Sequence, residues 1–559
     1  MTVPTPPAQG DAPTDASQTD ASQTDAARTD AAEAHVAPRV VLFRANSIGT
    51  DSRAKKLSVT LARLGYDVVV LSAEEPGAST RERRLGAPEH EVRVVPVPIS
   101  RTNRDLRLHT LVARRRRQFR FIDWTPTDEY VTQVAEAKTR VTGYKRTAVR
   151  TEAPSKALWA ARWAAGMALL RARRLRWRAQ WAVNVVYRTG WQRWDAWRVR
   201  SELLATTRGT LPEVEDYATS FSGVLDAQAP DIIHAHHPLV LGTAVRAARR
   251  RRAAGRRALV VYDAREDFLG LPKEEQGNWR RHSTLVREEA RYIREADAVM
   301  TVCEPISHRL QERYDLPVPP AVVLNVPVDD PRVRPGSPAL AGEPTVRDVV
   351  GLAPDVPLLV YAGAVSRARG LDVLVAALPK LPGVHAVVVA TPFPHPLQAP
   401  LAEQAASLGV ADRLHFAPPV DQDRLLHYLS GATLGAMVQR ADSANTAAAL
   451  PNKMFEYLHA GLPMFTSDAP LIAAFVTEHG LGTVFRDGDP DDLARAVREV
   501  LADPPDPCGQ AWEQLRRRYS WQGQEAMVRQ VYAALVPPPS PAGIDDPAFG
   551  SLSVTDPPS

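Results

Sequence analysis

The residues best suited to bind an anionic ligand lie in one segment, 450–465, in which a proline and a glycine are spaced like the ends of a short helix. Pro451 stands where a helix tolerates proline, and Gly461 stands where helices commonly end. The free N–H groups and the positive dipole end of such a helix suit a diphosphate. Glu456 follows about one turn later, where its carboxylate would accept hydrogen bonds from two ribose hydroxyls. Taken alone, a solvent-facing glutamate is the alternative.

A second set of polar residues ends an apolar run at 231–235. His236 and His237 follow that run directly, so we expect them at the end of a strand, with His236 contacting a bound ligand or serving as a structural histidine. The acidic pairs Asp329-Asp330 and Asp491-Asp492 flank turns and are expected to be solvated. No Asp-x-Asp stands where it would bridge a metal and a diphosphate, so we expect no required metal ion.

The elements that must position these residues are short apolar runs separated by helical patterns. Near-continuous apolar strands of this kind are typical of parallel sheets covered on both faces, and the pattern restarts after a Pro- and Gly-rich stretch at 331–354. We therefore expect an α/β protein with two Rossmann-like, doubly wound sheets and a ligand cleft at the carboxyl ends of their strands. The expected strands are Val40–Phe43, Asp67–Leu71, Val92–Val97, Asp231–Ala235, Ala258–Tyr262, Ala298–Val302 and Val322–Asn325, then Leu358–Tyr361, Ala386–Ala390, Arg413–Phe416, Leu434–Val438, Pro463–Thr466 and Thr483–Phe485.

The length of 559 residues exceeds what one hydrophobic core usually serves, which agrees with two domains. We expect the following divisions: a disordered polar tail at 1–36, an N-terminal domain at 37–335, a C-terminal domain at 336–518, a helix crossing back at 519–536 and a second disordered tail at 537–559. The two cysteines, Cys303 and Cys508, match no zinc spacing, and such low cysteine usage fits a reducing cytoplasm.

Residues 100–215 interrupt the N-terminal domain and differ from it in composition. Positions 101–200 hold 24 Lys and Arg against 7 Asp and Glu, a net +17, and eight of the eleven tryptophans lie in this insert. Trp159 and Trp163, like Trp177 and Trp181, are four residues apart and would share a helix face. Arginine beside tryptophan suits an anionic membrane surface. A packing layer and a protein-binding face are the alternatives, and no nucleic-acid module is recognised.

Seven segments in order along the chain, all outside this insert, resemble the retaining glycosyltransferases of family 4, which have the GT-B fold. The signature is the segment at 450–465. The others are NSIGTDSR (46–53), DIIHAHH (231–237), VVYDAREDF (260–268), ADAVMTVCEPISHRL (296–310), VVLNVP (322–327) and YAGAVSRARGLDVLVAAL (361–378).

The resemblance implies roles for particular residues. Glu456 would bind the nucleotide ribose, and Arg369 the donor diphosphate, where a guanidinium makes bidentate contacts and stabilises the leaving group. Gly363 would let the strand-end backbone approach the donor, and Arg367 is either a second phosphate contact or solvent-facing. The remaining implied residues are Asn452 and Lys453 near the phosphates, and Gly49, Arg265 and Glu266 on the acceptor side.

Three positions depart from the family pattern. Ala448 replaces a carboxylate that normally touches the donor sugar, so the sugar would be held by Asn445, Thr446 or backbone amides. Ala364 stands where a basic residue is common, and Arg265 replaces a histidine. These departures fit a subgroup with a shifted donor site, and they also fit a catalytically degenerate scaffold. A nucleotide-sugar epimerase of the same fold is a further alternative.

The family resemblance implies transfer of a hexose-type sugar, with retention, from a nucleotide-diphosphate sugar to an acceptor hydroxyl. In that mechanism the leaving phosphate acts as base, so positioning and charge stabilisation replace a protein nucleophile. The expected acceptor is a cell-surface glycan or a lipid-linked molecule. We expect a cytoplasmic protein, peripheral on the inner face of the cell membrane, with no cofactor and no nucleic-acid partner. No run of about 18 uncharged apolar residues predicts a spanning helix.

Overall fold

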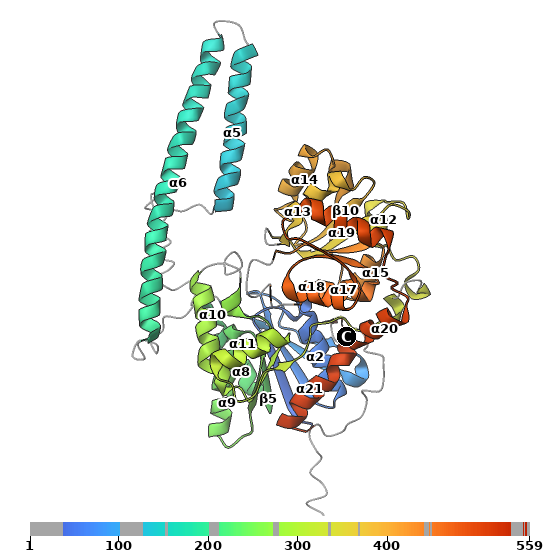
Figure 1. Cartoon of the computed structure of the whole chain (residues 1–559). Coiled ribbons are helices and arrows are strands. Elements are labelled where there is room, and N and C mark those ends of the chain that lie inside the picture. The colour runs from blue at the N-terminus through green and yellow to red at the C-terminus, as the bar shows by residue number, and fades with distance from the viewer. Residues whose placement is uncertain are drawn as a thin grey trace, which may run out of the picture. The chain divides into compact units, whose positions relative to one another are not determined.

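The computed structural model of the chain (Figure 1) describes residues 37–100, 127–150, 155–200, 212–271, 279–333, 337–366, 369–440, 447, 450–537, 552 and 554–555. The chain divides into two compact units, one formed by residues 100–219 and the other by the rest. The larger unit contains two separate sheets with helices on their faces. The predicted fold of two parallel-sheet α/β domains is therefore confirmed. The predicted disordered tail at 1–36 lies outside the described residues.

The first sheet has nine strands in the order β15-β3-β4-β2-β1-β5-β6-β7-β8. Its central strands run parallel, and they are buried because helices cover both faces. The strands are β1 (Arg39–Arg44), β2 (Asp67–Glu74), β3 (Arg83–Leu85), β4 (Val92–Pro98), β5 (Ile232–His236), β6 (Leu259–Ala264), β7 (Ala298–Thr301), β8 (Ala321–Val322) and β15 (Val554–Thr555). The helices of this half are α2 (Ser52–Arg63), α8 (Pro212–Ala227), α9 (Pro238–Ala253), α10 (Trp279–Tyr292) and α11 (Glu304–Tyr314).

The edge of this sheet differs from the sequence-based expectation. Strand β3 pairs antiparallel with β4. The sequence did not predict β3, because it is only three residues long and contains no apolar run. Val554 pairs with Leu85 and Thr555 with Arg84, so β15 extends the edge. An open strand edge offers unpaired backbone groups, and these two residues pair with it. Most of the predicted disordered tail at 537–559 lies outside the described residues.

The second sheet has six parallel strands in the order β11-β10-β9-β12-β13-β14. Two buried apolar clusters lie on its opposite faces. The strands are β9 (Leu358–Ala364), β10 (His385–Thr391), β11 (Leu414–Ala417), β12 (Leu434–Met437), β13 (Met464–Ser467) and β14 (Gly482–Phe485). The helices are α12 (Val346–Val350), α13 (Leu371–Ala377), α14 (Gln398–Ser407), α15 (Leu425–Ser430), α17 (Asn452–Ala460), α18 (Pro470–Glu478), α19 (Pro490–Ala502) and α20 (Gln510–Arg518).

After α20 the chain returns to the first sheet through α21 (Trp521–Leu535), which lies beside α2 in Figure 1. The side chain of Trp521 is completely buried, and its indole N–H donates to the Thr60 hydroxyl at 2.9 Å. Its backbone N–H donates to the carbonyl of Pro327, in the segment that leaves the first half, at 2.7 Å. One residue thus joins the outgoing segment, the returning helix and α2.

The face of α2 that receives these segments is polar although it is buried. Arg53, Lys56, Thr60 and Arg63 recur at the three- and four-residue spacing of one helix face, and each is at most 3% exposed. Arg53 donates to the Val323 carbonyl at 2.6 Å, and Lys56 donates to Asn325 Oδ1 at 3.1 Å and to the Val326 carbonyl. Arg63 and Thr60 both donate to Glu525 of α21, at 3.0 and 2.9 Å. Each buried polar side chain is therefore matched to a partner on a crossing segment.

The smaller unit contains two long helices that run side by side, α5 (Thr127–Arg150) and α6 (Ser155–Arg200), as Figure 1 shows. The tight contact between Gly166 and Val141 marks where the two helices meet: a Cβ added at Gly166 would lie 2.7 Å from the Val141 side chain. The aromatic ring of Trp159 lies 5.9 Å from that of Tyr144, and Lys145 lies over the Trp163 ring at 5.5 Å. Trp159 and Trp163 therefore face α5, where the sequence predicted an exposed Trp/Arg face.

Replacing Trp521 by alanine should lower the free energy of unfolding by about 3–5 kcal/mol, since a fully buried large aromatic is lost together with its hydrogen bond to Thr60. The denaturation midpoint checks this, measured by far-ultraviolet circular dichroism, which follows the backbone and not the tryptophan that is removed. Gln530→Ala, at an exposed position of the same helix, is the control and should change stability by less than about 0.5 kcal/mol. Equal effects from the two substitutions would contradict the role given to Trp521.

Candidate functional site

The predicted anion-binding helix is α17, which begins at Asn452 after Pro451 and ends at Gly461 in the left-handed conformation, with φ of 72°. Tyr457, completely buried on its inner face, fixes the helix to the sheet. The Tyr457 hydroxyl donates to the Val360 carbonyl and accepts from the Ala362 N–H, both at 3.1 Å. The start of α17 is thereby held against β9, close to the strand's carboxyl end.

Two basic side chains and one carboxylate gather at this helix start. The ammonium of Lys453 lies over the Tyr361 ring at 3.8 Å. Burial, and then the neighbouring positive charge of Arg369, hold the pKa of Lys453 well below its ordinary value. Burial raises the pKa of Glu456, although Lys453, Lys56 and a hydrogen bond from Gln422 favour its ionised form. An anion bound between Lys453 and Arg369 would relieve their mutual repulsion, so this group of charges suits a phosphate.

The loop after β9 brings Arg369 to this place. Gly363 has a φ of 122° and Gly370 a φ of 66°, a region that favours glycine. A Cβ at Gly370 would lie 2.0 Å from the Val438 carbonyl oxygen, so the loop can approach the end of β12 only with glycine there. Arg369 Nη1 donates to Gln439 Oε1 at 3.4 Å. Glycine at 370 therefore places the Arg369 guanidinium beside the segment that follows β12.

Several predicted donor residues cannot be compared with this geometry. Arg367, Asn445 and Thr446, like Ala448, lie outside the described residues. Asn452 is described and is exposed at the first position of α17. The structure thus brings together Arg369, Lys453 and Glu456 of the predicted donor set.

In the N-terminal half, Arg265 joins the residue that caps the start of α2 to residues at the ends of β5 and β6. Its guanidinium donates to Asp51 Oδ2 at 2.6 Å, to Asp263 Oδ2 at 3.1 Å and to His236 Nδ1 at 2.8 Å. Arg53 also pairs with both oxygens of Asp263, each at 2.8 Å. Burial opposes ionisation of Asp263, but Arg53, His236 and Arg265 hold its pKa well below the usual range. Arg265 therefore occupies the family's histidine position as a built-in part of a buried charge network.

His236 is 4% exposed at the end of β5. Burial, and then the neighbouring His234 and Arg265, hold its pKa well below the usual value, so the ring is neutral. Its Nδ1 lies 2.8 Å from Arg265 and 2.9 Å from Asp263 Oδ2, so one neighbour suits each tautomer. Its Nε2 is buried and has no hydrogen-bond partner among the described residues. Either tautomer leaves Nε2 as a polar atom that can donate or accept a further hydrogen bond.

Two other predicted acceptor-side residues, Gly49 and Glu266, are exposed on the loops after β1 and β6. The Gly49 N–H donates to the Ser47 hydroxyl at 3.4 Å. These loops also carry Asp51 and Arg265, which are paired with each other. The predicted acceptor residues therefore lie around one edge of the first sheet, where Arg265 is in direct contact with His236.

The ligand atoms of His234, His236 and Asp263 lie within 4.8 Å of one another, which is close enough to consider a metal ion. The chemistry does not fit a metal, because two guanidiniums already pair with the carboxylate and a further cation would be repelled by both. His234 is also committed, through Nδ1, to the Tyr532 hydroxyl of α21. We assign this cluster to positioning rather than to metal binding.

Sequence reasoning missed several residues of the site. Asp51, Arg53 and Asp263 lie inside the resembling segments, so their positions offered a signal that was not used. Lys56 and Gln422 gave none, because Lys56 stands in an ordinary amphipathic helix pattern and Gln422 in a polar loop. Both become part of the site only through the charge of Glu456.

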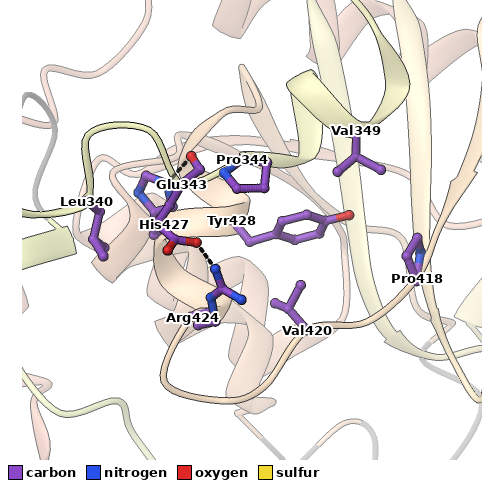
Figure 2. A pocket seen from close by; sticks show the side chains of 9 residues that line it. All are labelled: Leu340, Glu343, Pro344, Val349, Pro418, Val420, Arg424, His427 and Tyr428. Carbon is purple, nitrogen blue, oxygen red and sulfur yellow. Dashed lines mark hydrogen bonds and ion pairs between the residues drawn. The ribbon is translucent and has the colours of Figure 1, made fainter.

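A hollow in the C-terminal half lies apart from these residues and is shown in Figure 2. The Tyr428 ring lies across it, and the ion pair between Glu343 and Arg424 borders it. The Tyr428 hydroxyl is buried without a hydrogen-bond partner among the described residues, and burial raises its pKa. None of the predicted site residues lines this mainly apolar hollow, which is formed by Leu340, Glu343, Pro344, Val349, Pro418, Val420, Arg424, His427 and Tyr428.

Two models of known protein families match parts of this chain. Residues 343–525 match the family model described as Glycosyl transferases group 1, and residues 179–332 match that described as Glycosyltransferase Family 4. The second match begins inside α6, so the family resemblance reaches further into the insert than the sequence motifs indicated.

Curated relatives include the D-inositol 3-phosphate glycosyltransferase of Nocardia farcinica, 29% identical over 223 residues, which are 38% of this chain and 47% of the relative. The enzyme of the same name from Mycolicibacterium smegmatis is 26% identical over 239 residues, 42% of this chain and 52% of the relative. The chain thus spans about half the length of the curated relatives it matches.

Solved structures share the fold at low identity. Sucrose-phosphate synthase from Thermosynechococcus elongatus superposes with a TM-score of 0.54 and 13% identity, covering 89% of this chain and 99% of that one. A glycosyltransferase from Rickettsia africae ESF-5 gives a TM-score of 0.50 and 11% identity, with the same coverage of both chains.

The buried Lys56 generates a pH-dependent prediction. Burial, and then the positive charge of Arg53, lower the pKa of Lys56 to about 7. Between about pH 7 and 10 the unfolded chain holds this proton and the folded chain does not, so this group makes the folded state less stable as the pH falls towards 7. The free energy of unfolding of Lys56→Met, minus that of the wild type, should therefore increase as the pH falls from about 10 to 7. The limiting slope of this difference is about 1.4 kcal/mol per pH unit. Denaturation across that range checks this, and a constant difference would contradict it.

Proposed function

Since this chain belongs to the family-4 glycosyltransferases of the GT-B fold, we propose that it transfers a hexose-type sugar from a nucleotide-diphosphate sugar to an acceptor hydroxyl. The observation that supports the donor most directly is the grouping of Arg369, Lys453 and the start of α17, with Glu456 one turn further along the helix. Two cations and free backbone N–H groups suit the diphosphate, and the carboxylate suits the ribose hydroxyls.

The proposed reaction proceeds with retention of the anomeric configuration. The bond from the anomeric carbon to the diphosphate oxygen breaks, and the acceptor oxygen bonds to the same face of that carbon. The acceptor proton passes to the leaving phosphate oxygen. Arg369 and Lys453 stabilise the negative charge that grows on the diphosphate, so the protein needs no nucleophile of its own. We propose that these two side chains supply the neutralising charge without a required metal ion.

The acceptor would bind at the strand ends of the first half. His236 Nε2 is the buried polar atom there that a sugar hydroxyl would satisfy, and Arg265 with Asp263 holds its ring in place. We propose a glycan or a lipid-linked molecule of the cell surface as acceptor. The curated relatives are named for an inositol phosphate acceptor, and the arginines of this half would accommodate an anionic group on the acceptor.

A lipid-linked acceptor requires the enzyme to reach a membrane. Among the residues that the structure describes, none of the helices has both the length and the apolar character needed to cross a bilayer. We therefore propose a cytoplasmic enzyme that binds peripherally to the inner face of the cell membrane through residues 100–215.

Nucleotide binding distinguishes this proposal from a degenerate scaffold. Arg369→Ala and Glu456→Ala should each weaken binding of UDP or GDP tenfold to a hundredfold, because a charge-assisted contact contributes about 1.5–3 kcal/mol. Thermal shift against nucleoside diphosphates, followed by calorimetry, measures this. Lys380→Ala, which removes an exposed basic side chain paired with Asp491 in the same half, is the control and should bind like the wild type. A wild-type protein that responds to neither nucleotide would favour the scaffold.

Product stereochemistry tests the reaction itself. Incubation with an α-linked UDP- or GDP-hexose and a hydroxyl acceptor should give an α-linked product, because the diphosphate leaves and the acceptor oxygen attacks on the same face of the sugar. Proton NMR of the anomeric centre reads the outcome. A β-linked product would overturn the retaining mechanism, and conversion of the donor into an epimeric nucleotide sugar would favour the epimerase.

A further inference from the structure

One face of α6 between residues 157 and 182 is almost entirely apolar. At about 100° per residue, twelve positions fall within an arc of about 140°, and eleven of them are alanine or leucine. All twelve are exposed. We call this the outer face of α6; its members are Ala157, Leu158, Ala161, Ala164, Ala165, Ala168, Leu169, Ala172, Leu175, Arg176, Ala179 and Ala182.

The opposite side of the helix is the one that packs. Trp159 and Trp163 contact residues of α5, and Leu170 is buried. On the outer face, by contrast, Leu158 and Leu169 are each 55% exposed and Leu175 is 72% exposed. Within the described part of the chain, this face therefore leaves three leucine side chains exposed to solvent.

Basic residues border the outer face on both sides. Arg171 and Arg178 follow one edge in the helical projection, and Arg162 and Arg173 follow the other. Residues 155–182 contain seven Lys and Arg and no Asp or Glu. An apolar face between two rows of arginine is the pattern of a helix that lies in the plane of an anionic membrane, where the arginine stems reach up to the headgroups.

We propose that the outer face of α6 is the surface that docks onto an anionic lipid bilayer, with the helix axis parallel to the membrane. Leu158, Leu169 and Leu175 would enter the acyl boundary, and the bordering arginines would contact lipid phosphates. The proposal deepens the peripheral membrane location and rests on that part of the proposed function, but not on the transfer reaction.

Charge selects the bilayer over the other occupants. A second copy would bring two rows of arginine against two more, without acidic residues in 155–182 to pair with them. A nucleic acid would use the arginines but would leave the three exposed leucines without a partner. The anionic bilayer satisfies both features with one surface.

Sedimentation of the full chain with vesicles tests the proposal. Binding should require phosphatidylglycerol in the phosphatidylcholine vesicles and should weaken as the salt concentration rises. The triple variant Leu158→Ser, Leu169→Ser and Leu175→Ser should lower the partition coefficient at least tenfold. Val149→Ser removes an equally exposed apolar residue on α5, outside the outer face, and should leave the partition coefficient unchanged.

A second set of variants separates the arginine rows from net charge alone. Arg162→Gln, Arg171→Gln and Arg178→Gln together should lower the partition coefficient on the order of 100-fold. Lys138→Gln, Arg140→Gln and Arg146→Gln remove the same charge from α5 and should have a smaller effect. Equal losses from the two triple variants, or a leucine variant that sediments like the wild type, would overturn the proposal.

Two further outcomes are distinguishable. Tight binding to duplex nucleic acid that the leucine variant retains would assign the arginine rows to nucleic acid. Concentration-dependent dimers that the leucine variant abolishes would assign the outer face to a second copy. Each variant should keep the wild-type thermal response to nucleoside diphosphates, so a failed membrane test leaves the donor site untouched, and a failed nucleotide test leaves the membrane surface untouched.

Discussion

The rest of the structure depends on the buried polar face of α2. Arg53 and Lys56 hold the segment that leaves the first sheet, whereas Thr60 and Arg63 hold the helix that returns to it. A buried arginine or lysine is tolerated only when its charge and donors are matched. Here the matching groups come from chain segments about 270 and 460 residues away, so α2 has its partners only when both crossings are in place.

The same helix also links the fold to the chemistry. Arg53 pairs with Asp263, which is hydrogen-bonded to His236. Lys56 interacts electrostatically with the carboxylate of Glu456 on α17. Both halves hold more positive than negative charge around their strand ends. In the first half the guanidiniums of Arg44, Arg53 and Arg265 pair with the carboxylates of Asp51 and Asp263. In the second half Lys453 and Arg369 lie near Glu456. The diphosphate of the proposed sugar-nucleotide donor would provide the anionic charge that the second half lacks.

The sequence allowed the main elements to be predicted because their causes are local. Fully buried strands such as β5 and β10 are continuous apolar runs, and α17 is bounded by Pro451 and Gly461. The edge strands β3 and β15 were missed because two- and three-residue pairings depend on a neighbouring edge rather than on their own residues. The strand predicted at Val322–Asn325 ends earlier, at Val322. Val323 and Asn325 instead accept hydrogen bonds from α2.

The residues of the candidate site could be predicted only where they belong to a sequence motif. Glu456, Lys453 and Arg369 lie together because α17 and the Gly370 loop are local structures with clear sequence signals. Lys56 belongs to the site because it lies near Glu456, which is 400 positions away in the sequence. The periodicity of α2 could not distinguish a buried polar face from a solvated one. The tryptophans of α6 show the same limit, because i,i+4 spacing identified a shared face but not that α5 covers it.

A crystal structure of the protein with a nucleoside diphosphate tests the central claim most directly, namely that the start of α17 and Arg369 form the diphosphate site. We predict diphosphate oxygens within hydrogen-bond distance of the Arg369 guanidinium and the first backbone N–H groups of α17, with the ribose hydroxyls on Glu456. A nucleotide bound in the first half, or one whose phosphates contact neither Arg369 nor α17, would contradict the account.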